Sequence, residues 1–298
     1  MSSVIATPRL SNCLGLAIAW AIMVSIASAA PTPATTVAWL ENYGQAYAQA
    51  RAESKMLLVY FQPGYSSSLT SQFDVEAQSS PNVQLKLASV VAARLPVDYP
   101  SQSGGRLIDN AAFGELAGQP GAVMIDLAHP GSDYYGQVVS VLPFQSGKYY
   151  HFQPSYLGVM LDLPPGTLTQ RTMVFAVRIH PEAPASTWGS PDMGLMSAAR
   201  SHSQDQAQRQ LQGHHNWDQR FQHLTGQLPG GMHAKEVVAE SWPGEGLMDA
   251  AVDCVDSWRQ SSGHWSAVRA SQPMFGYDMK RGGNGIWYAT GLFGTSLN

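Results

Sequence analysis

The chain has 298 residues, with 17 Lys and Arg against 21 Asp and Glu, and two cysteines. This mildly acidic balance lacks the basic footprint of a nucleic-acid-binding protein. Two cysteines are too few for a disulfide scaffold, a four-thiolate zinc site or a cysteine-held iron–sulfur cluster. Hydrophobic residues make up 44% of the chain, which is typical of a folded protein, and the length suggests about two domains.

The first 29 residues have the features of a secretory signal peptide. Arg9 supplies a positive charge, residues 14–24 are apolar, and residues 27–29 (Ala-Ser-Ala) form a cleavage site of small residues. The apolar run is shorter than the ~20 residues that a membrane span needs, and no later stretch is long and apolar enough to serve. We therefore expect an exported protein, secreted or periplasmic after cleavage, with no membrane span.

Cleavage would remove Cys13 and leave Cys254 as the one remaining cysteine, so we expect no intramolecular disulfide in the mature chain. Cys254 lies in an apolar helical pattern, which is typical of a buried, inert thiol rather than of a nucleophile. We therefore expect no thiol chemistry from this residue.

The segment over residues 37–163 predicts alternating helices and strands. The near-continuous apolar run over residues 56–61 is typical of a buried central strand. The expected order is a helix over 39–52, a strand over 56–61, a helix, a strand over 90–98, a connection containing a helix, a hairpin of strands over 121–127 and 136–142, and a helix over 156–163.

This order resembles a thioredoxin-like α/β domain. In thioredoxins the central strand ends in Phe, and the CxxC motif begins five residues later at the start of a helix. Counting from Phe61 leads to residues 66–69 (Ser-Ser-Ser-Leu), which contain no cysteine, while Pro120 precedes the third strand as a proline does in the family. The resemblance implies the fold without its dithiol. Because thiol–disulfide exchange needs a thiolate, we expect no redox activity.

The chain breaks near Pro164 and Pro165, and we expect a second domain over residues 172–298. After an apolar stretch over residues 172–179, the periodicity predicts two helices and two strands. These are a helix over 195–211 that stops at Gly213, a helix over 246–260, and strands over 275–279 and 286–293 with an Asn-Gly hairpin signal between them.

This second segment resembles the CAP superfamily of cysteine-rich secretory proteins, venom allergens, plant pathogenesis-related proteins and their bacterial relatives, over about residues 177–295. In that family a long helix leads to a first His, an E-N-x-A motif follows, and a V-x-x-W helix ends in S-x-G-H. Residues 236–239 (Glu-Val-Val-Ala) match the second motif, with Val237 in place of Asn. The third motif is matched by Val255, Trp258, Ser261, Gly263 and His264.

The resemblance implies an α-β-α sandwich with two His and two acidic residues in one cleft, and several members bind zinc through the two His. His214 is the candidate first His because it follows the helix stop, with His215 as the alternative; His264 is the second, and Glu236 is the first acid. The family's second Glu is absent here, and Glu240 is a candidate substitute. Neutral imidazoles are good zinc ligands, but two protein ligands predict weak binding.

Each of these residues also has a purely structural explanation. His264 could interact with the dipole at a helix C-terminus, and Glu236 could accept hydrogen bonds from backbone amides. The pattern as a whole favours an exported, non-redox protein whose CAP-like domain binds a small or amphiphilic molecule, a lipid or a surface partner, with zinc as a possible cofactor. The alternatives are a zinc-assisted hydrolase, in which His214 and His264 hold the metal and Glu236 is the general base, and a structural scaffold.

Overall fold

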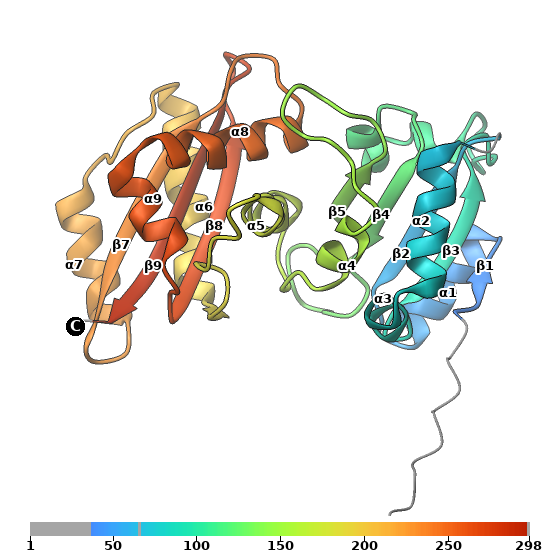
Figure 1. Cartoon of the computed structure of the whole chain (residues 1–298), viewed down its shortest axis with the longest axis horizontal. Coiled ribbons are helices and arrows are strands. Elements are labelled where there is room, and N and C mark those ends of the chain that lie inside the picture. The colour runs from blue at the N-terminus through green and yellow to red at the C-terminus, as the bar shows by residue number, and fades with distance from the viewer. Residues whose placement is uncertain (1–36, 65–66, 297–298) are drawn as a thin grey trace, which may run out of the picture. The chain divides into compact units, whose positions relative to one another are not determined.

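The computed structural model describes residues 37–64 and 67–296 (Figure 1). The expected signal peptide over residues 1–29, Cys13 and Ser66 lie outside the described residues. The described residues belong to one unit that contains two mixed β-sheets with helices packed on them. The chain is therefore a mixed α/β and α+β protein, as expected.

The first sheet has the strand order β1-β3-β2-β4-β5. β1 and β2 run parallel to β3, whereas β4 runs antiparallel to both β2 and β5. β2 is central, and its residues from Leu57 to Phe61 are fully buried, which confirms the expectation from its apolar run. The strands are β1 (Trp39–Leu40), β2 (Leu57–Gln62), β3 (Val91–Pro96), β4 (Gly121–Ile125) and β5 (Val138–Pro143).

The helices next to the first sheet follow the expected order, with one correction. The single helix predicted over residues 39–52 is wrong, because Trp39 and Leu40 pair with β3 and only then does Asn42 cap the helix α1. The Trp39 ring packs edge-on against Tyr60 of β2, which holds this short segment on the sheet. The helices are α1 (Tyr43–Ala52), α2 (Ser68–Ser79), α3 (Pro81–Leu87) and α4 (Tyr156–Leu161), with 3-10 helices η1 (Leu107–Asp109) and η2 (Ala111–Leu116).

The second sheet has the strand order β6-β8-β9-β7, so β7 lies at one edge. β9 runs antiparallel to both β7 and β8, and β6 runs parallel to β8. The turn between β8 and β9 has Gly285 at φ +79°, where glycine is favoured, as the Asn-Gly signal predicted. The strands are β6 (Ser190–Pro191), β7 (Met232–Glu240), β8 (Met274–Arg281) and β9 (Trp287–Ser296).

Helices cover both faces of the second sheet. A Cβ at Gly276 of β8 would lie 2.3 Å from backbone atoms of α6, whereas the next residue, Tyr277, packs against Trp258 of α8. Because neighbouring strand residues point to opposite faces, α6 and α8 lie on opposite sides of the sheet. The helices are α5 (Leu168–Ile179), α6 (Met193–Arg209), α7 (Trp217–Gln227), α8 (Leu247–Gln260) and α9 (Ser262–Arg269).

Three local expectations for this half need correction. The helix predicted over residues 195–211 ends earlier, because Gln210 takes a left-handed conformation at its C-cap. The two strands predicted for this half did not include β7, and Glu236 lies in the middle of this nine-residue strand. The chain starts a new helix, α9, directly after α8, so His264 lies in the first turn of a helix and not at the end of one.

The boundary expected near Pro164 and Pro165 is crossed by a buried arginine. Arg171 of α5 donates to the Ser140 hydroxyl of β5 at 2.7 Å and to the carbonyls of Leu163 and Pro164. α5 also packs against β8, and one continuous hydrophobic core includes residues from both sheets. None of the helices in the described part of the chain combines the length and apolarity needed to cross a membrane.

Candidate functional site

Side chains from four separate segments meet beside the edge strand β7. Glu236 lies in the middle of β7, on the same face as Ala234, which packs against α6 and α7. His202 comes from α6, His214 from the loop that joins α6 to α7, and His264 from the first turn of α9. The structure thus brings together three of the residues proposed from the sequence, His214, Glu236 and His264.

The two imidazoles of His214 and His264 face each other. Their Nε2 atoms lie 3.4 Å apart, and their ring centroids are separated by 5.6 Å. Nδ1 of His214 lies 2.9 Å from Oε1 of Glu236. Because an ionised carboxylate only accepts hydrogen bonds, Nδ1 of His214 carries a proton, and in the neutral ring the lone pair is on the Nε2 that faces His264.

The carboxylate of Glu236 is buried and fully engaged. Its side chain is 1% exposed, and Arg220 of α7 binds it with two nitrogens, Nη1 to Oε2 and Nη2 to Oε1, the latter at 2.8 Å. Burial acts to raise the pKa of Glu236, but the hydrogen bonds from Arg220 and His214 outweigh it and hold the pKa below its usual range. Glu236 is therefore an anion that orients His214.

Arg220 and His202 also hold the loop that carries His214. The Nε of Arg220 donates to the carbonyl of His215 at 3.0 Å, and Nε2 of His202 lies 3.0 Å from the carbonyl of Gly213. The carbonyls on either side of His214 are thus tied to α7 and α6. Burial lowers the pKa of His202, although Glu236 acts in the opposite direction, and the lowered pKa favours a neutral imidazole.

The remaining candidate residues lie apart from this cluster. His215, the alternative to His214 as the first His, directs its Nε2 to the carbonyl of Leu211, and His214 is the one that faces His264. Glu240 is exposed at the end of β7, four residues and roughly 13 Å along the strand from Glu236.

Burial, together with the neighbouring His214, lowers the pKa of His264, which favours its neutral form.

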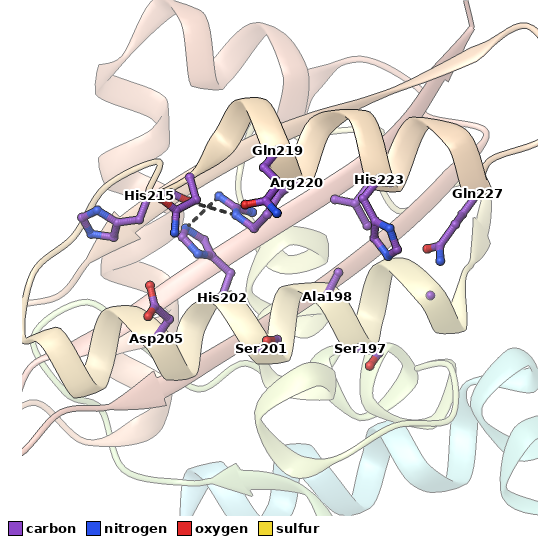
Figure 2. A pocket seen from close by; sticks show the side chains of 13 residues that line it. Ser197, Ala198, Ser201, His202, Asp205, His215, Gln219, Arg220, His223 and Gln227 are labelled. Carbon is purple, nitrogen blue, oxygen red and sulfur yellow. Dashed lines mark hydrogen bonds between the residues drawn. The ribbon is translucent and has the colours of Figure 1, made fainter.

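A cleft of about 720 Å³ lies between α6 and α7, and Arg220 and His202 form part of its wall. Figure 2 shows His202 and Arg220 next to each other in its wall, with their hydrogen bonds dashed. The rest of the wall is mostly hydroxyl, amide and imidazole groups. Its labelled members include Ser197, Ser201, His215, Gln219, His223 and Gln227 (Figure 2).

Two imidazole nitrogens are the metal ligands that this cluster offers. Within residues 37–64 and 67–296, no group of three or more His, Cys, Asp or Glu side chains is arranged to hold one. The pair of imidazoles does fit: two nitrogens at about 2.05 Å from one tetrahedral zinc ion are about 3.3–3.4 Å apart, and the observed separation is 3.4 Å. The carboxylate on Nδ1 of His214 is a common second-sphere partner of zinc-binding imidazoles.

Reasoning from the sequence missed Arg220 and the buried role of His202. A signal for Arg220 was present, since an acid inside an apolar strand needs a cationic partner. The apolar spacing of Trp217, Phe221 and Leu224 also indicates a helix that could carry one. What the sequence lacked was any indication that this helix lies over β7.

The chain matches no protein-family model, and no curated protein matches it. Among solved structures it is similar to the solution structure of a thioredoxin from Thermus thermophilus, at 20% identity and a TM-score of 0.25. The match covers 36% of this chain and 75% of the thioredoxin.

Proposed function

We propose that this chain is an exported protein whose C-terminal half is a CAP-like module that binds a divalent metal ion, zinc first of all, through His214 and His264. The module would use this site to bind a small or amphiphilic molecule or a surface partner. The layered arrangement of α6 and α7, the second sheet, and α8 and α9 supports the CAP-like assignment. So do the positions of Val255 and Trp258, buried in α8 as the motif requires.

The observation that carries the metal assignment is the 3.4 Å between the two Nε2 atoms. With both rings neutral and Nδ1 of His214 protonated, His264 donates its Nε2 proton to the lone pair on Nε2 of His214. The tautomer of His264 with its proton on Nδ1 would leave lone pairs on both Nε2 atoms, which is what two imidazole ligands of one zinc ion need. His214 and His264 would hold the ion, which supplies a Lewis acid with open positions for a ligand.

The hydrolase alternative is less well supported. It needs a carboxylate that can take a proton from water beside the metal, whereas Glu236 is buried and both its oxygens are engaged by Arg220 and His214. Glu240 is exposed, but it lies too far along β7 to take that role. The arrangement favours binding over catalysis.

For the N-terminal half we propose a thioredoxin-like domain without redox function. The strand order of the first sheet, in which β1, β3 and β2 run parallel and β4 runs antiparallel to its neighbours β2 and β5, supports this. At the start of α2, where the family places its dithiol, the Ser67 hydroxyl accepts from the Thr70 backbone N–H as a helix cap. Cys254 is fully buried, and burial raises the pKa of its thiol well above the usual value.

Calorimetric zinc titration of the mature protein, with the H264A and H214A variants alongside, tests the metal assignment. We expect one weak site per chain in the wild type and no measurable binding in either variant, with the fold retained in all three. Equal zinc binding by the wild type and both variants, or none by the wild type, overturns the proposal.

A further inference from the structure

We propose that Arg220 is a positioning residue for the metal site: it aligns His214 with His264 by holding both the carboxylate and the loop next to His214. The inference rests on the metal binding proposed above. Arg220 touches neither imidazole of the pair, so its effect on metal affinity is indirect and passes through Glu236 and the loop backbone.

The first contact sets the direction of the Glu236 carboxylate. Arg220 binds both oxygens, which is the geometry that a planar guanidinium provides and an ammonium does not. With both oxygens held, Oε1 has one orientation in which to accept from Nδ1 of His214. That hydrogen bond in turn keeps the proton on Nδ1 and the lone pair on Nε2.

The second contact sets the position of the loop. The Nε of Arg220 donates to the carbonyl of His215, which adjoins His214 in the chain. Arg220 therefore holds both the backbone next to His214 and the Glu236 carboxylate that accepts the Nδ1 proton of His214. A pair of nitrogens 3.4 Å apart depends on both, because a shift of about 1 Å is enough to weaken a pre-organised site.

Arg220 is also reachable from solvent. It lines the open cleft between α6 and α7, so truncation of its side chain would leave a space continuous with that cleft (Figure 2). A guanidinium ion from solution could then enter and replace the missing group. This makes the proposal testable by chemical rescue as well as by substitution.

The test is zinc titration of the full mature chain with three variants. R220A is expected to lose about tenfold in zinc affinity, the low end of the range for residues that orient metal ligands. R220K, which keeps the charge but not the two-pronged contact, is expected to lose several-fold. The matched control is R209A: Arg209 pairs with Asp205 on α6, beside the same cleft, and should leave the affinity unchanged.

Two further measurements separate positioning from a general loss of structure. In an E236Q background R220A should cause little further loss, because the two residues act through one path. Addition of guanidinium at about 50 mM, far below the molar concentrations that unfold proteins, should restore much of the affinity of R220A, whereas urea at the same concentration should not.

The outcomes distinguish this inference from the metal assignment. If the wild type binds zinc through the two His and folded R220A and R220K bind it equally well, the positioning role is wrong and the metal site stands. Loss in R220A that guanidinium does not reverse, with R220K like the wild type, also overturns it. Should R220A fail to fold, the comparison of R220K with R209A decides.

Discussion

Two histidines in this molecule each place Nδ1 next to a buried carboxylate, and only one of them belongs to the proposed site. His214 is 43% exposed, and its Nδ1 lies 2.9 Å from the buried carboxylate of Glu236. His129, in the loop between β4 and β5, is 41% exposed, and its Nδ1 lies 2.7 Å from the buried carboxylate of Asp126. In both, an acceptor-only carboxylate requires a proton on Nδ1, so the lone pair of the neutral ring is on Nε2.

The difference lies in what surrounds each pair. The Nε2 of His214 faces a second imidazole, and Glu236 is held by an arginine. Asp126 is instead held by the backbone N–H groups of Ala128 and His129, which belong to its own turn. The same pairing of a carboxylate with Nδ1 of a histidine therefore stabilises a turn at Asp126 and orients a proposed metal ligand at Glu236. The second imidazole makes the distinction.

The largest effect that separates the two histidines should appear on addition of zinc. We expect the imidazole nitrogen resonances of His214 and His264 to shift and those of His129 to stay in place, in a ¹H–¹⁵N spectrum of the mature protein. Before zinc is added, His214 and His129 should both show the tautomer protonated at Nδ1. A zinc-induced shift at His129 equal to that at His214 would remove the distinction.

The two buried carboxylates should also differ in their contribution to stability. E236Q leaves Arg220 without its anionic partner and should lower the free energy of unfolding by about 3 kcal/mol, the low end for breaking a buried ion pair, since Arg220 is partly exposed. D126N should cost only about 1 kcal/mol, because an amide oxygen can still accept from the turn. Urea unfolding of both variants measures this, and equal losses would contradict it.

A third carboxylate, Glu245, has a raised pKa and, unlike Glu236, no arginine bound to it within residues 37–64 and 67–296. Both its oxygens are buried and have no hydrogen-bond partner among the described residues, and burial, together with Asp253 and Asp249, raises its pKa to about 7. Because the pKa of Glu245 is higher in the folded chain than its value of about 4.3 in the unfolded chain, the protonated carboxyl adds to the free energy of unfolding. This contribution is complete below about pH 4.3 and is lost as the pH rises to about 7.

E245Q should therefore raise the melting temperature more at pH 8 than at pH 5, because it removes a charge that the fold tolerates poorly only at the higher pH. The effect should be smaller than that of E236Q, since Glu245 lies near the surface. E240Q, at an exposed position, is the control and should change little at either pH. A gain for E245Q that does not depend on pH would contradict the assignment.

The smallest expected change in stability is at Ser67, whose hydroxyl caps the N-terminus of α2 next to the first sheet. S67A removes the hydroxyl that caps α2 and should cost about 1 kcal/mol of stability. Neither S67A nor the wild type should reduce insulin disulfides, because no thiolate is present at this turn. Detectable turnover by either protein would contradict the expectation that the N-terminal half has no redox activity.

Much of the fold could be predicted because its signals are local. The apolar run of β2, the 3.6-residue spacing of α6 and α8, and the Asn-Gly turn between β8 and β9 each depend on a few neighbouring residues. The predictions failed where a tertiary contact overrides the local pattern. Trp39 and Leu40 fit a helical spacing, yet their pairing with β3 draws them into the sheet.

The sequence by itself determined that His214, Glu236 and His264 were candidate site residues, because the type and order of residues are properties of the chain before it folds. Only the tertiary structure decided how they meet. Arg220 is 16 residues from Glu236 and His264 is 50 from His214. Their contacts exist because α7 and α9 pack beside β7, and such packing depends on the whole core rather than on any local spacing. Tertiary packing also explains why the pKa of Glu236 is lowered and that of Glu245 is raised, because the burial and the hydrogen-bond partners of a carboxylate are set by the folded chain.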